Sequence, residues 1–247
     1  MIEVHRVTKR FGEYLAVDIG SLKVPHGSVF GFIGPNGAGK TTKIKMMVGL
    51  LQPNTGDITI DNNHITHQSL EAKRRFAYLP DKPQVYEKLT GREFVQFMAN
   101  LYHKPYTNDQ LNKKMQDYFE IFKLTDKADE YIQSYSHGMR QKIAIVGALI
   151  HDPPLMILDE PLIGLDPPSS KLLKDILVDR AKSGHTVLLT THILEVAEKI
   201  CDMIAVINQG RIVFQGSTRE LQASKGNKSL EDIFLAMIDD DAVPDEA

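Results

Sequence analysis

A glycine-rich segment at residues 34–41 constrains this sequence more than any other feature. It is G-P-N-G-A-G-K-T, which fits the pattern G-x-x-x-x-G-K-[ST]. Its glycines allow the backbone to curl so that successive N–H groups face one anion. The segment follows an apolar run of strand length at residues 28–33 and precedes a helical pattern at residues 41–51. A strand, this loop and a helix in that order predict a phosphate-binding loop in an α/β fold.

Each residue type in this loop suits the binding of a phosphate chain. Lys40 is expected to reach the β- and γ-phosphates as a point charge, and the Thr41 hydroxyl is expected to ligate Mg²⁺. The start of the following helix adds partial positive charge. A glycine-rich turn without a ligand is the alternative, and the position of the loop between a strand and a helix disfavours it. The residues expected to contact phosphate are Gly34, Pro35, Asn36, Gly37, Ala38, Gly39, Lys40, Thr41 and Thr42.

A pair of carboxylates after a second apolar run supplies the other half of the site. Residues 155–158 are Leu-Met-Ile-Leu, which predicts a buried strand that ends at Asp159. Open α/β sheets bind their ligands at the carboxyl ends of such strands. Asp159 is expected to hold Mg²⁺, usually through water, and Glu160 to polarise an attacking water molecule. An acidic turn before Pro161 is the alternative, and the phosphate loop in the same chain makes it the weaker one.

The periodicity of apolar residues predicts an α/β core that is interrupted by helices. Strands are predicted at residues 2–7, 17–24, 28–33, 57–60, 76–79, 155–158, 186–190, 203–207 and 211–214. Helices are predicted at residues 41–51, 94–102, 108–122, 139–150, 169–181 and 194–200. We therefore expect a parallel core sheet with an N-terminal antiparallel β subdomain and an all-helical insertion at about residues 88–150.

Capping patterns predict where three of the helices begin. Thr90 and Glu93 fit a capping box in front of the helix at residues 94–102. Two similar patterns, S-T-R-E at residues 217–220 and S-L-E-D at residues 229–232, predict helices near the C-terminus. The last residues, 239–247, are acidic with few apolar groups, which is typical of a solvated, disordered tail.

Charge and cysteine content argue against several classes of protein. The formal net charge of −3 disfavours a nucleic-acid binder that relies on bulk positive charge. The single cysteine, Cys201, excludes an internal disulfide bond. The first residues lack the apolar stretch of a signal peptide, and runs such as residues 143–150 fall far short of the roughly 20 residues of a membrane span. If the chain works in transport, another polypeptide is expected to supply the pore.

Taken in order, these motifs resemble the nucleotide-binding domain of the ABC ATPase family over about residues 2–220. The segment Y-S-H-G-M at residues 135–139 stands where the family has its signature, usually L-S-G-G-Q, directly before a predicted helix. Residues 164–166, Gly-Leu-Asp, resemble the D-loop of the family, which lies across the dimer seam. His192 follows a predicted strand and resembles the switch histidine, and Phe11 resembles the aromatic residue that stacks on adenine.

The resemblance implies a fold, a reaction and two ligands. The fold is a P-loop NTPase core, and the reaction is hydrolysis of ATP to ADP and phosphate with Mg²⁺ as cofactor. Glu160 and His192 would be the catalytic residues, and Phe11 would hold the adenine. The implied Mg²⁺ ligands are Thr41, Asp81 and Asp159. The implied nucleotide contacts at the dimer seam are Ser136, His137, Gly138 and Asp166.

The resemblance also implies partners and a location. Two ATPase subunits, identical or different, would close head-to-tail around two ATP molecules, because each half-site is incomplete. A separate integral membrane subunit, the permease, would handle the cargo, and no nucleic-acid partner is expected. The motor would lie on the cytoplasmic face of the membrane, held there by this partner. Residues 1–220 would form the ATPase domain, and residues 221–247 a short helix with an acidic tail.

Two motifs differ from the commonest form in the family. The signature has Tyr135, His137 and Met139 in place of Leu, Gly and Gln. A Y-S-x-G-M form is similar to that of ABC-2-type exporters, which favours export. Asp81 stands where the family usually has Gln, and its carboxylate can still offer an oxygen to Mg²⁺. Gln84 is a nearby alternative for this role.

Two other functions stay open. A non-transport member of the family would act on ribosomes or nucleic acid. Ribosome-acting members usually carry two such domains in one chain, and DNA-acting members carry a long coiled coil, whereas this sequence has neither. The motor of an importer is the closer rival, and the form of the signature only weakly disfavours it.

Overall fold

Ten strands pair into one mixed sheet in the computed structural model, which describes residues 1–102, 106–224 and 232–234. The strands are β1 (Ile2–Phe11), β2 (Tyr14–Val24), β3 (Val29–Ile33), β4 (Thr55–Ile60), β5 (Asn63–His64), β6 (Phe76–Leu79), β7 (Leu155–Asp159), β8 (Thr186–Thr191), β9 (Met203–Asn208) and β10 (Arg211–Ser217). The helices are α1 (Lys40–Met47), α2 (Ser69–Lys73), α3 (Gly91–Leu101), α4 (Asn108–Ile121), α5 (His137–Ile150), α6 (Pro167–Lys182), α7 (Leu194–Ile200) and α8 (Thr218–Ser224). The strand order is β5-β4-β1-β2-β10-β9-β3-β8-β7-β6.

The central strands β6, β7, β8, β3 and β9 run parallel to one another. Successive side chains of a strand point to opposite faces of the sheet. On β7, Leu155 and Ile157 join the core that includes α1 and the N-terminal strands. Met156 and Leu158 join the core that includes α5 and α6. Because both faces are covered, β7 is a continuous apolar run instead of an alternating one.

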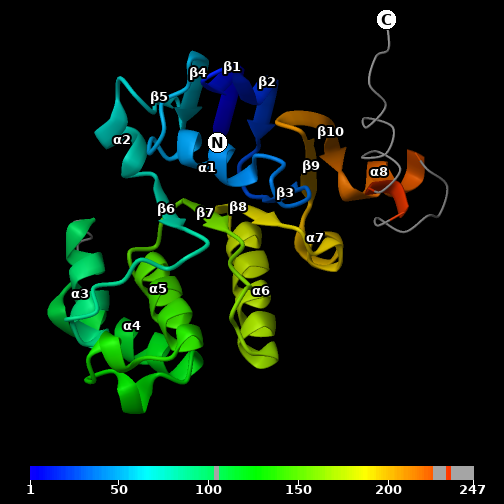
Figure 1. Ribbon diagram of the computed structural model, residues 1–247. Helices are drawn as coiled ribbons and strands as arrows, with labels where there is room; N and C mark the ends of the chain where they lie inside the picture. Colours follow the sequence, from blue (N-terminus) through cyan, green and yellow to red (C-terminus); the bar gives the residue numbers. More distant parts are fainter. Residues whose placement is uncertain (103–105, 225–231, 235–247) are drawn as a thin grey trace, which may run out of the picture.

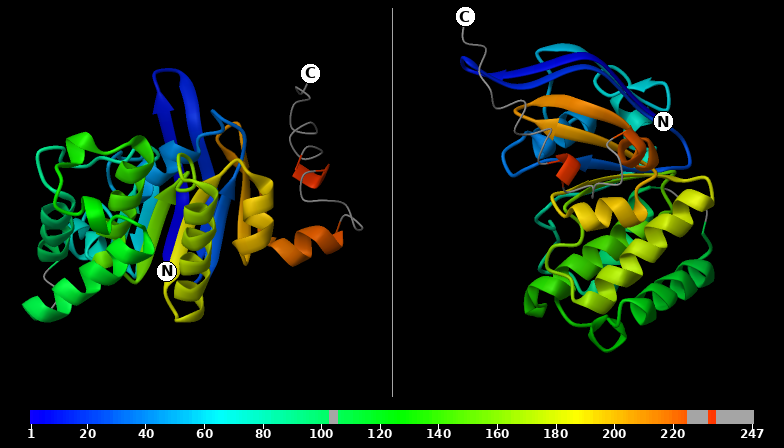
Figure 2. Two further views of the ribbon diagram at one scale, coloured as in Figure 1. Left: turned by 90° about the horizontal axis from the view of Figure 1, so that it is seen from below. Right: turned by 90° about the vertical axis from the view of Figure 1, so that its right-hand side faces the viewer.

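The N-terminal strands form the antiparallel part of the sheet. β1 pairs with β2 on one side and with β4 on the other. A parallel contact between Asp18 of β2 and Arg211 of β10 joins these strands to the rest of the sheet. Figure 1 shows them above the core strands, with α5 and α6 below, and the right-hand view of Figure 2 shows the same order of layers. The predicted fold, a parallel core with N-terminal antiparallel strands and added helices, is confirmed.

Helices α3, α4 and α5 come between β6 and β7 in the sequence and gather beside the β6 edge of the sheet (Figure 1). The predicted capping box at the start of α3 is confirmed. The Glu93 amide donates to the Thr90 hydroxyl at 3.2 Å, and the Thr90 amide donates to the Glu93 carboxylate at 2.8 Å. Apolar side chains of all three helices, such as Phe94, Phe119 and Ile143, belong to the same core as α6.

Several boundaries differ from the prediction, each for a local reason. The helix predicted at residues 41–51 ends at Met47, because Gly49 takes a φ of 72° that breaks the helical path. The strand predicted at residues 2–7 continues to Phe11, since it pairs with β2 along its length. The short elements β5 and α2 were not predicted, because neither is long enough to show a periodic pattern.

The predicted helix start at Ser217 is confirmed. The Glu220 amide donates to the Ser217 hydroxyl at 3.0 Å, and the Ser217 amide donates to the Glu220 carboxylate at 2.9 Å, where α8 begins. The start predicted at Ser229 and the acidic tail at residues 239–247 lie outside the described residues. In the part of the chain that the structure describes, no helix has both the length and the hydrophobicity that crossing a membrane requires.

Candidate functional site

The loop between β3 and α1 depends on glycine at two positions. Gly37 and Gly39 have φ angles of 85° and 91°, a region that residues with a side chain disfavour. Gly39 is the N-cap of α1 and has no side chain that could satisfy the first N–H groups of the helix. The first turn of α1 contains no acidic residue. The amides at this helix start, with their partial positive charge, suit an anionic ligand such as a phosphate chain.

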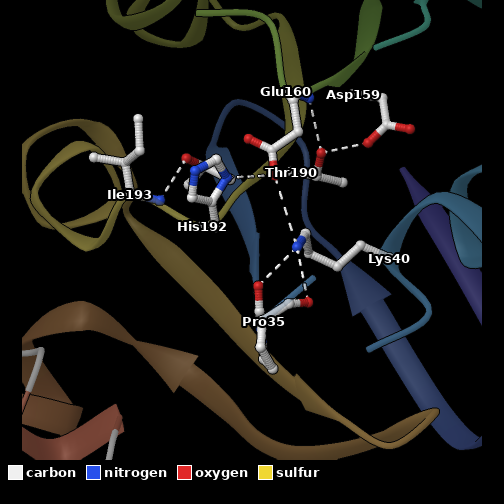
Figure 3. Close-up of polar contacts among 9 residues, drawn as sticks. Pro35, Lys40, Asp159, Glu160, Thr190, His192 and Ile193 are labelled. Atoms are coloured by element: carbon white, nitrogen blue, oxygen red, sulfur yellow. Dashed lines mark hydrogen bonds and ion pairs between the residues drawn. The ribbon is translucent and has the colours of Figure 1, made fainter. Parts of the chain in front are cut away.

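Lys40 is buried at the floor of this loop. Its ammonium donates to the carbonyl oxygens of Gly34 at 2.7 Å and Pro35 at 3.2 Å, and lies 3.7 Å from Glu160 Oε1 (Figure 3). Burial lowers the pKa of Lys40, and the nearby carboxylates of Glu160 and Asp159 oppose this effect. A polyphosphate would therefore meet a lysine that is already held in place by two carbonyl oxygens and a carboxylate.

Asp159 ends β7 as a fully buried carboxylate. The Thr190 hydroxyl donates to its Oδ1 at 2.5 Å (Figure 3). Its Oδ2 is buried and has no hydrogen-bond partner among the described residues. Burial raises the pKa of Asp159, and the carboxylates of Asp81 and Glu160 raise it further. A buried carboxylate with one unsatisfied oxygen fits a cation, because a metal ion would supply the missing partner.

The donor set fits Mg²⁺ bound together with a phosphate chain. In the described ranges, no cluster of three or more His, Cys, Asp or Glu residues could hold a metal ion by protein ligands alone. The Thr41 hydroxyl is close enough to Asp159 to lower its pKa by hydrogen bonding. Mg²⁺ commonly takes one or two carboxylates and completes its shell with phosphate oxygens and water. Thr41, Asp159 and Asp81 are therefore the residues that could hold it.

Glu160 takes an uncommon backbone conformation directly after β7, with a φ of 48°. Its amide donates to the Thr190 hydroxyl at 2.9 Å, so Thr190 contacts both Asp159 and Glu160. On the other side, Glu160 Oε1 lies 3.1 Å from His192 Nδ1 (Figure 3). The carboxylate is thus oriented by a histidine and by a lysine, Lys40, as a general base or a water-orienting group would need to be.

The residues of the two predicted motifs surround one open pocket of about 530 Å³. Its lining residues are Asn36, Gly37, Gly39, Lys40, Thr41, Thr42, Asp81, Lys82, His137, Glu160, Ile163 and His192. Asp81 follows β6 and reaches this pocket, whereas Gln84 lines a separate groove. The Asp81 carboxylate also accepts a hydrogen bond from the Lys82 amide at 2.8 Å.

Gly34, Pro35 and Ala38 belong to the phosphate loop but do not line this pocket. Outside that loop, four of the predicted nucleotide contacts lie away from it. Phe11, at the end of β1, is 52% exposed, and the Lys9 Nζ lies 5.5 Å from its ring centroid. Ser136 caps α5, with its hydroxyl accepting from the Met139 amide. Gly138 and Asp166 do not line the pocket either. Within one chain, only His137 of the signature segment reaches the pocket.

Sequence analysis missed the role of two side chains. Thr190 joins the Asp159 carboxylate to the Glu160 amide, and its only signal is a polar pair at the end of an apolar strand. Tyr135 is buried and donates its hydroxyl proton to the Lys127 carbonyl at 2.5 Å, which explains a tyrosine where leucine is usual. The Tyr135 pKa is raised to about 12, mainly by burial, so the hydroxyl stays protonated as a donor.

Comparison with known proteins places this site in a family. The profile described as "ABC transporter" matches residues 17–163. The daunorubicin/doxorubicin resistance ATP-binding protein DrrA of Streptomyces peucetius is 37% identical, over 93% of this chain and 69% of that protein. The ABC transporter ATP-binding protein NatA of Bacillus subtilis is 33% identical, over 88% of both chains.

Solved structures agree with these relatives. A structure of the ATP-binding subunit of an ABC transporter superposes with a TM-score of 0.89 at 30% identity, covering 96% of this chain and 99% of that one. A bacterial ABC transporter cassette solved as a dimer has the same fold, with a TM-score of 0.80 at 23% identity over 88% of this chain and 98% of that one. The chain therefore belongs to the ABC transporter family and is one of its ATP-binding, ATP-hydrolysing subunits.

Proposed function

We propose that this chain is the motor of an exporter and that it drives a separate membrane subunit. The observation that carries the ATPase part is the pocket in which Lys40, Glu160 and His192 converge. Export is supported by relatives. Besides DrrA, the Nod factor export ATP-binding protein I of Ralstonia nicotianae is 35% identical over 90% of this chain and 68% of that protein. In this proposal the ATPase domain spans residues 1–220.

The chain's own residues would position and neutralise the reacting groups. Lys40 and the amides at the start of α1 would hold the β- and γ-phosphates of ATP. Glu160, oriented by His192, would align a water molecule for in-line attack on the γ-phosphate. Mg²⁺, held by Thr41, Asp159 and Asp81, would neutralise phosphate charge. Phe11, on the exposed end of β1, would stack on adenine.

A second ATPase subunit is needed to complete this site in our proposal. Ser136, Gly138 and Asp166 do not line the pocket of their own chain. The Ser136 hydroxyl and the start of α5 are exposed, so a phosphate group held by another subunit could approach them. Two subunits arranged head-to-tail would each contribute this segment to the pocket of the other. Hydrolysis would then depend on closure of the dimer.

A groove on this chain is the proposed docking site for the membrane subunit. A groove of about 630 Å³ lies between helices α3 and α5 and the segment formed by β6 and the residues that follow it. Large apolar side chains in it stay exposed, including Tyr86 at 58%, Leu101 at 56% and Phe97 at 40%. Exposed apolar clusters of this kind suit a protein partner. Asp81 lies on the same connecting segment as this groove and also lines the nucleotide pocket, so it would link the two. Docking there would hold the motor at the cytoplasmic face of the membrane.

The test is affinity purification of the tagged Glu160→Gln variant from detergent-solubilised native membranes in the presence of ATP. This change is expected to hold the closed state, and copurified proteins are identified by mass spectrometry. A polytopic membrane protein at matching stoichiometry is the expected result. Recovery only from the soluble fraction, with ribosomes, nucleic acid or nothing bound, would contradict the transport function and leave the ATPase assignment in place.

A further inference from the structure

The start of α5 is fastened to the loop that follows Glu160, which we call the catalytic loop (residues 160–166). The His137 ring lies directly against Gly164. A Cβ built on Gly164 would fall 2.7 Å from both Cδ2 and Nε2 of the ring, and Gly164 has a φ of 81°. The ring therefore occupies the space beside a backbone position that only glycine can fill. Family members usually have glycine at position 137 and could not make this ring contact.

Three more contacts hold the same two segments together. The buried Gln141 side chain donates to the Pro161 carbonyl at 3.1 Å. The Lys142 ammonium, with only 12% of its side chain exposed, lies 2.8 Å from Asp166 Oδ2. Gly138 packs so closely that a Cβ on it would lie 3.0 Å from the Gly164 carbonyl oxygen. The catalytic loop is thus held near its beginning, in its middle and at its end by the first two turns of α5.

This attachment reaches Glu160 directly. Pro161 is the next residue in the chain, and the Glu160 carboxylate is held to His192 at 3.1 Å and to Lys40 at 3.7 Å. A shift of α5 therefore moves the peptide bond between Glu160 and Pro161, and with it the position of the Glu160 carboxylate. His137 is the exposed member of the attachment and also lines the nucleotide pocket. A group that binds at the start of α5 can therefore contact the His137 ring and displace it.

We propose that His137 is a positioning residue for Glu160 of its own chain. Closure of a partner subunit on α5 would move the His137 ring against Gly164 and bring the catalytic loop into its hydrolytic position. This inference rests on the proposed dimer, because the partner's nucleotide is what reaches α5. Under this proposal, His137 affects hydrolysis at the site of its own chain. If His137 instead contacted the partner's nucleotide directly, it would affect hydrolysis at the partner's site.

Mixed dimers with two affinity tags separate the two roles. The reference dimer pairs a wild-type subunit with a Glu160→Gln subunit, so its single working site combines the wild-type Glu160 with α5 of the other subunit. His137→Gly is placed in the wild-type subunit in one preparation and in the Glu160→Gln subunit in the other. Steady-state ATPase assays give kcat and KM, and thermal unfolding checks that both dimers are folded.

We expect kcat to fall about tenfold when His137→Gly is in the wild-type subunit, because a misplaced catalytic group costs at least that much. KM for ATP should stay within about twofold, and the reverse placement should leave kcat near the reference. His137→Phe in the wild-type subunit should restore most of kcat, because it keeps a ring against Gly164. Loss only in the reverse placement would overturn the proposal in favour of direct nucleotide contact. Equal losses in both placements would also overturn it.

Lys142→Met provides a second variant that does not alter the His137 ring. It should also lower kcat only in the wild-type subunit, since Lys142 holds the end of the same loop. An unchanged kcat in both the Lys142→Met and the His137→Gly preparations would overturn the attachment as a positioning device. A reference dimer that hydrolyses no ATP, although wild-type subunits alone do, would also overturn the proposal, because one subunit's own His137 and Glu160 would then not be sufficient for turnover. If wild-type subunits also fail, the proposed function itself is wrong.

Discussion

At the scale of single residues, Glu160 is the side chain whose chemistry is easiest to isolate. Its φ of 48° and its contacts to Thr190, His192 and Lys40 hold the carboxylate beside the phosphate loop. Strained backbone of this kind costs of the order of 1 kcal/mol and persists where the surrounding contacts enforce it. The same contacts would hold a glutamine side chain, which has nearly the same shape but cannot act as a base.

Glu160→Gln is therefore expected to keep ATP binding and lose turnover. The Kd for ATP should stay within about threefold of wild type, while kcat falls by about 10² or more, the usual contribution of a general base. Equilibrium binding of a labelled nucleotide and a phosphate-release assay measure the two quantities. Thr190→Val, which removes the hydroxyl bonded to the Asp159 carboxylate and to the Glu160 amide, should lower kcat less. Turnover at the wild-type rate in Glu160→Gln would end the assignment of Glu160.

Lys43 makes the stability of the protein depend on pH in an unusual direction. It is fully buried behind the phosphate loop, its Nζ has no hydrogen-bond partner among the described residues, and burial lowers its pKa to about 7. Between this pKa and the ordinary value of 10.5, the unfolded chain binds a proton that the folded chain does not. Stability from this group therefore rises with pH across that interval, by up to about 1.4 kcal/mol per pH unit.

Lys43→Met should remove this rise, because methionine fills a similar space without a charge. Denaturant unfolding of both proteins at several pH values between 7 and 10 gives the difference in the free energy of unfolding. The variant should be more stable near pH 7, and the difference should shrink as the pH approaches 10. Parallel pH profiles for the two proteins would show that Lys43 finds a partner or solvent in the folded state.

Asp81 connects the nucleotide pocket to the groove proposed for the membrane subunit. Asp81→Ala is expected to change the coupling of hydrolysis to transport more than the affinity for ATP, because the phosphate loop still binds the nucleotide. The checks are the Kd for ATP and the transport rate in reconstituted vesicles. Gln84→Ala is the matched control, since Gln84 lines only the groove. Equal losses of ATP binding and transport in Asp81→Ala would contradict this role.

At the scale of elements, the first turn of α3 is fitted to the Tyr135 side chain. A Cβ added to Gly91 would overlap the Tyr135 hydroxyl, which is itself bonded to the Lys127 carbonyl. The same Cβ would lie 3.2 Å from the Ala128 carbonyl oxygen. The absence of a side chain at Gly91 therefore leaves room for the Tyr135 ring, whose hydroxyl bonds the signature segment to the Lys127 carbonyl.

This fit predicts a coupled pair of substitutions. Gly91→Ala should lower the free energy of unfolding by about 1–3 kcal/mol through overpacking, and Tyr135→Phe by about 1 kcal/mol through the lost hydrogen bond. The double variant should lose less unfolding free energy than the two single variants lose together, because phenylalanine removes the hydroxyl that would overlap the added Cβ. A double-mutant cycle by urea unfolding measures the interaction. Strict additivity would show that the backbone shifts to accept the extra carbon.

At the scale of the whole molecule, the exposed aromatic groove decides whether the motor can be recruited. Phe97→Glu should reduce the membrane subunit recovered with the tagged protein by about tenfold or more, because charge is introduced at an apolar docking surface. ATPase activity of the isolated protein should stay near wild type, since the nucleotide pocket is separate. Ile121→Glu is the matched control, an exposed apolar residue of α4 outside the groove. Equal recovery of the two variants would place the docking surface elsewhere.

Much of the site was predictable because it is local in sequence. The phosphate loop depends on glycines within eight residues, and Asp159 follows a strand whose continuous apolar run requires burial on both faces. The capping box at Thr90 is predictable for the same reason, since its two partners are three residues apart. These features follow from backbone conformation and short-range hydrogen bonds.

Other features were decided only by the tertiary structure. Thr190 reaches Asp159 because β7 and β8 pair in one register, which places residues 31 positions apart side by side. The contact of His137 with Gly164 depends on how α5 packs against the catalytic loop. Lys43 is a charged residue of the short helix α1, yet its side chain is completely buried. Periodicity gives the faces of an element, whereas distances between elements come from the packing of the whole core.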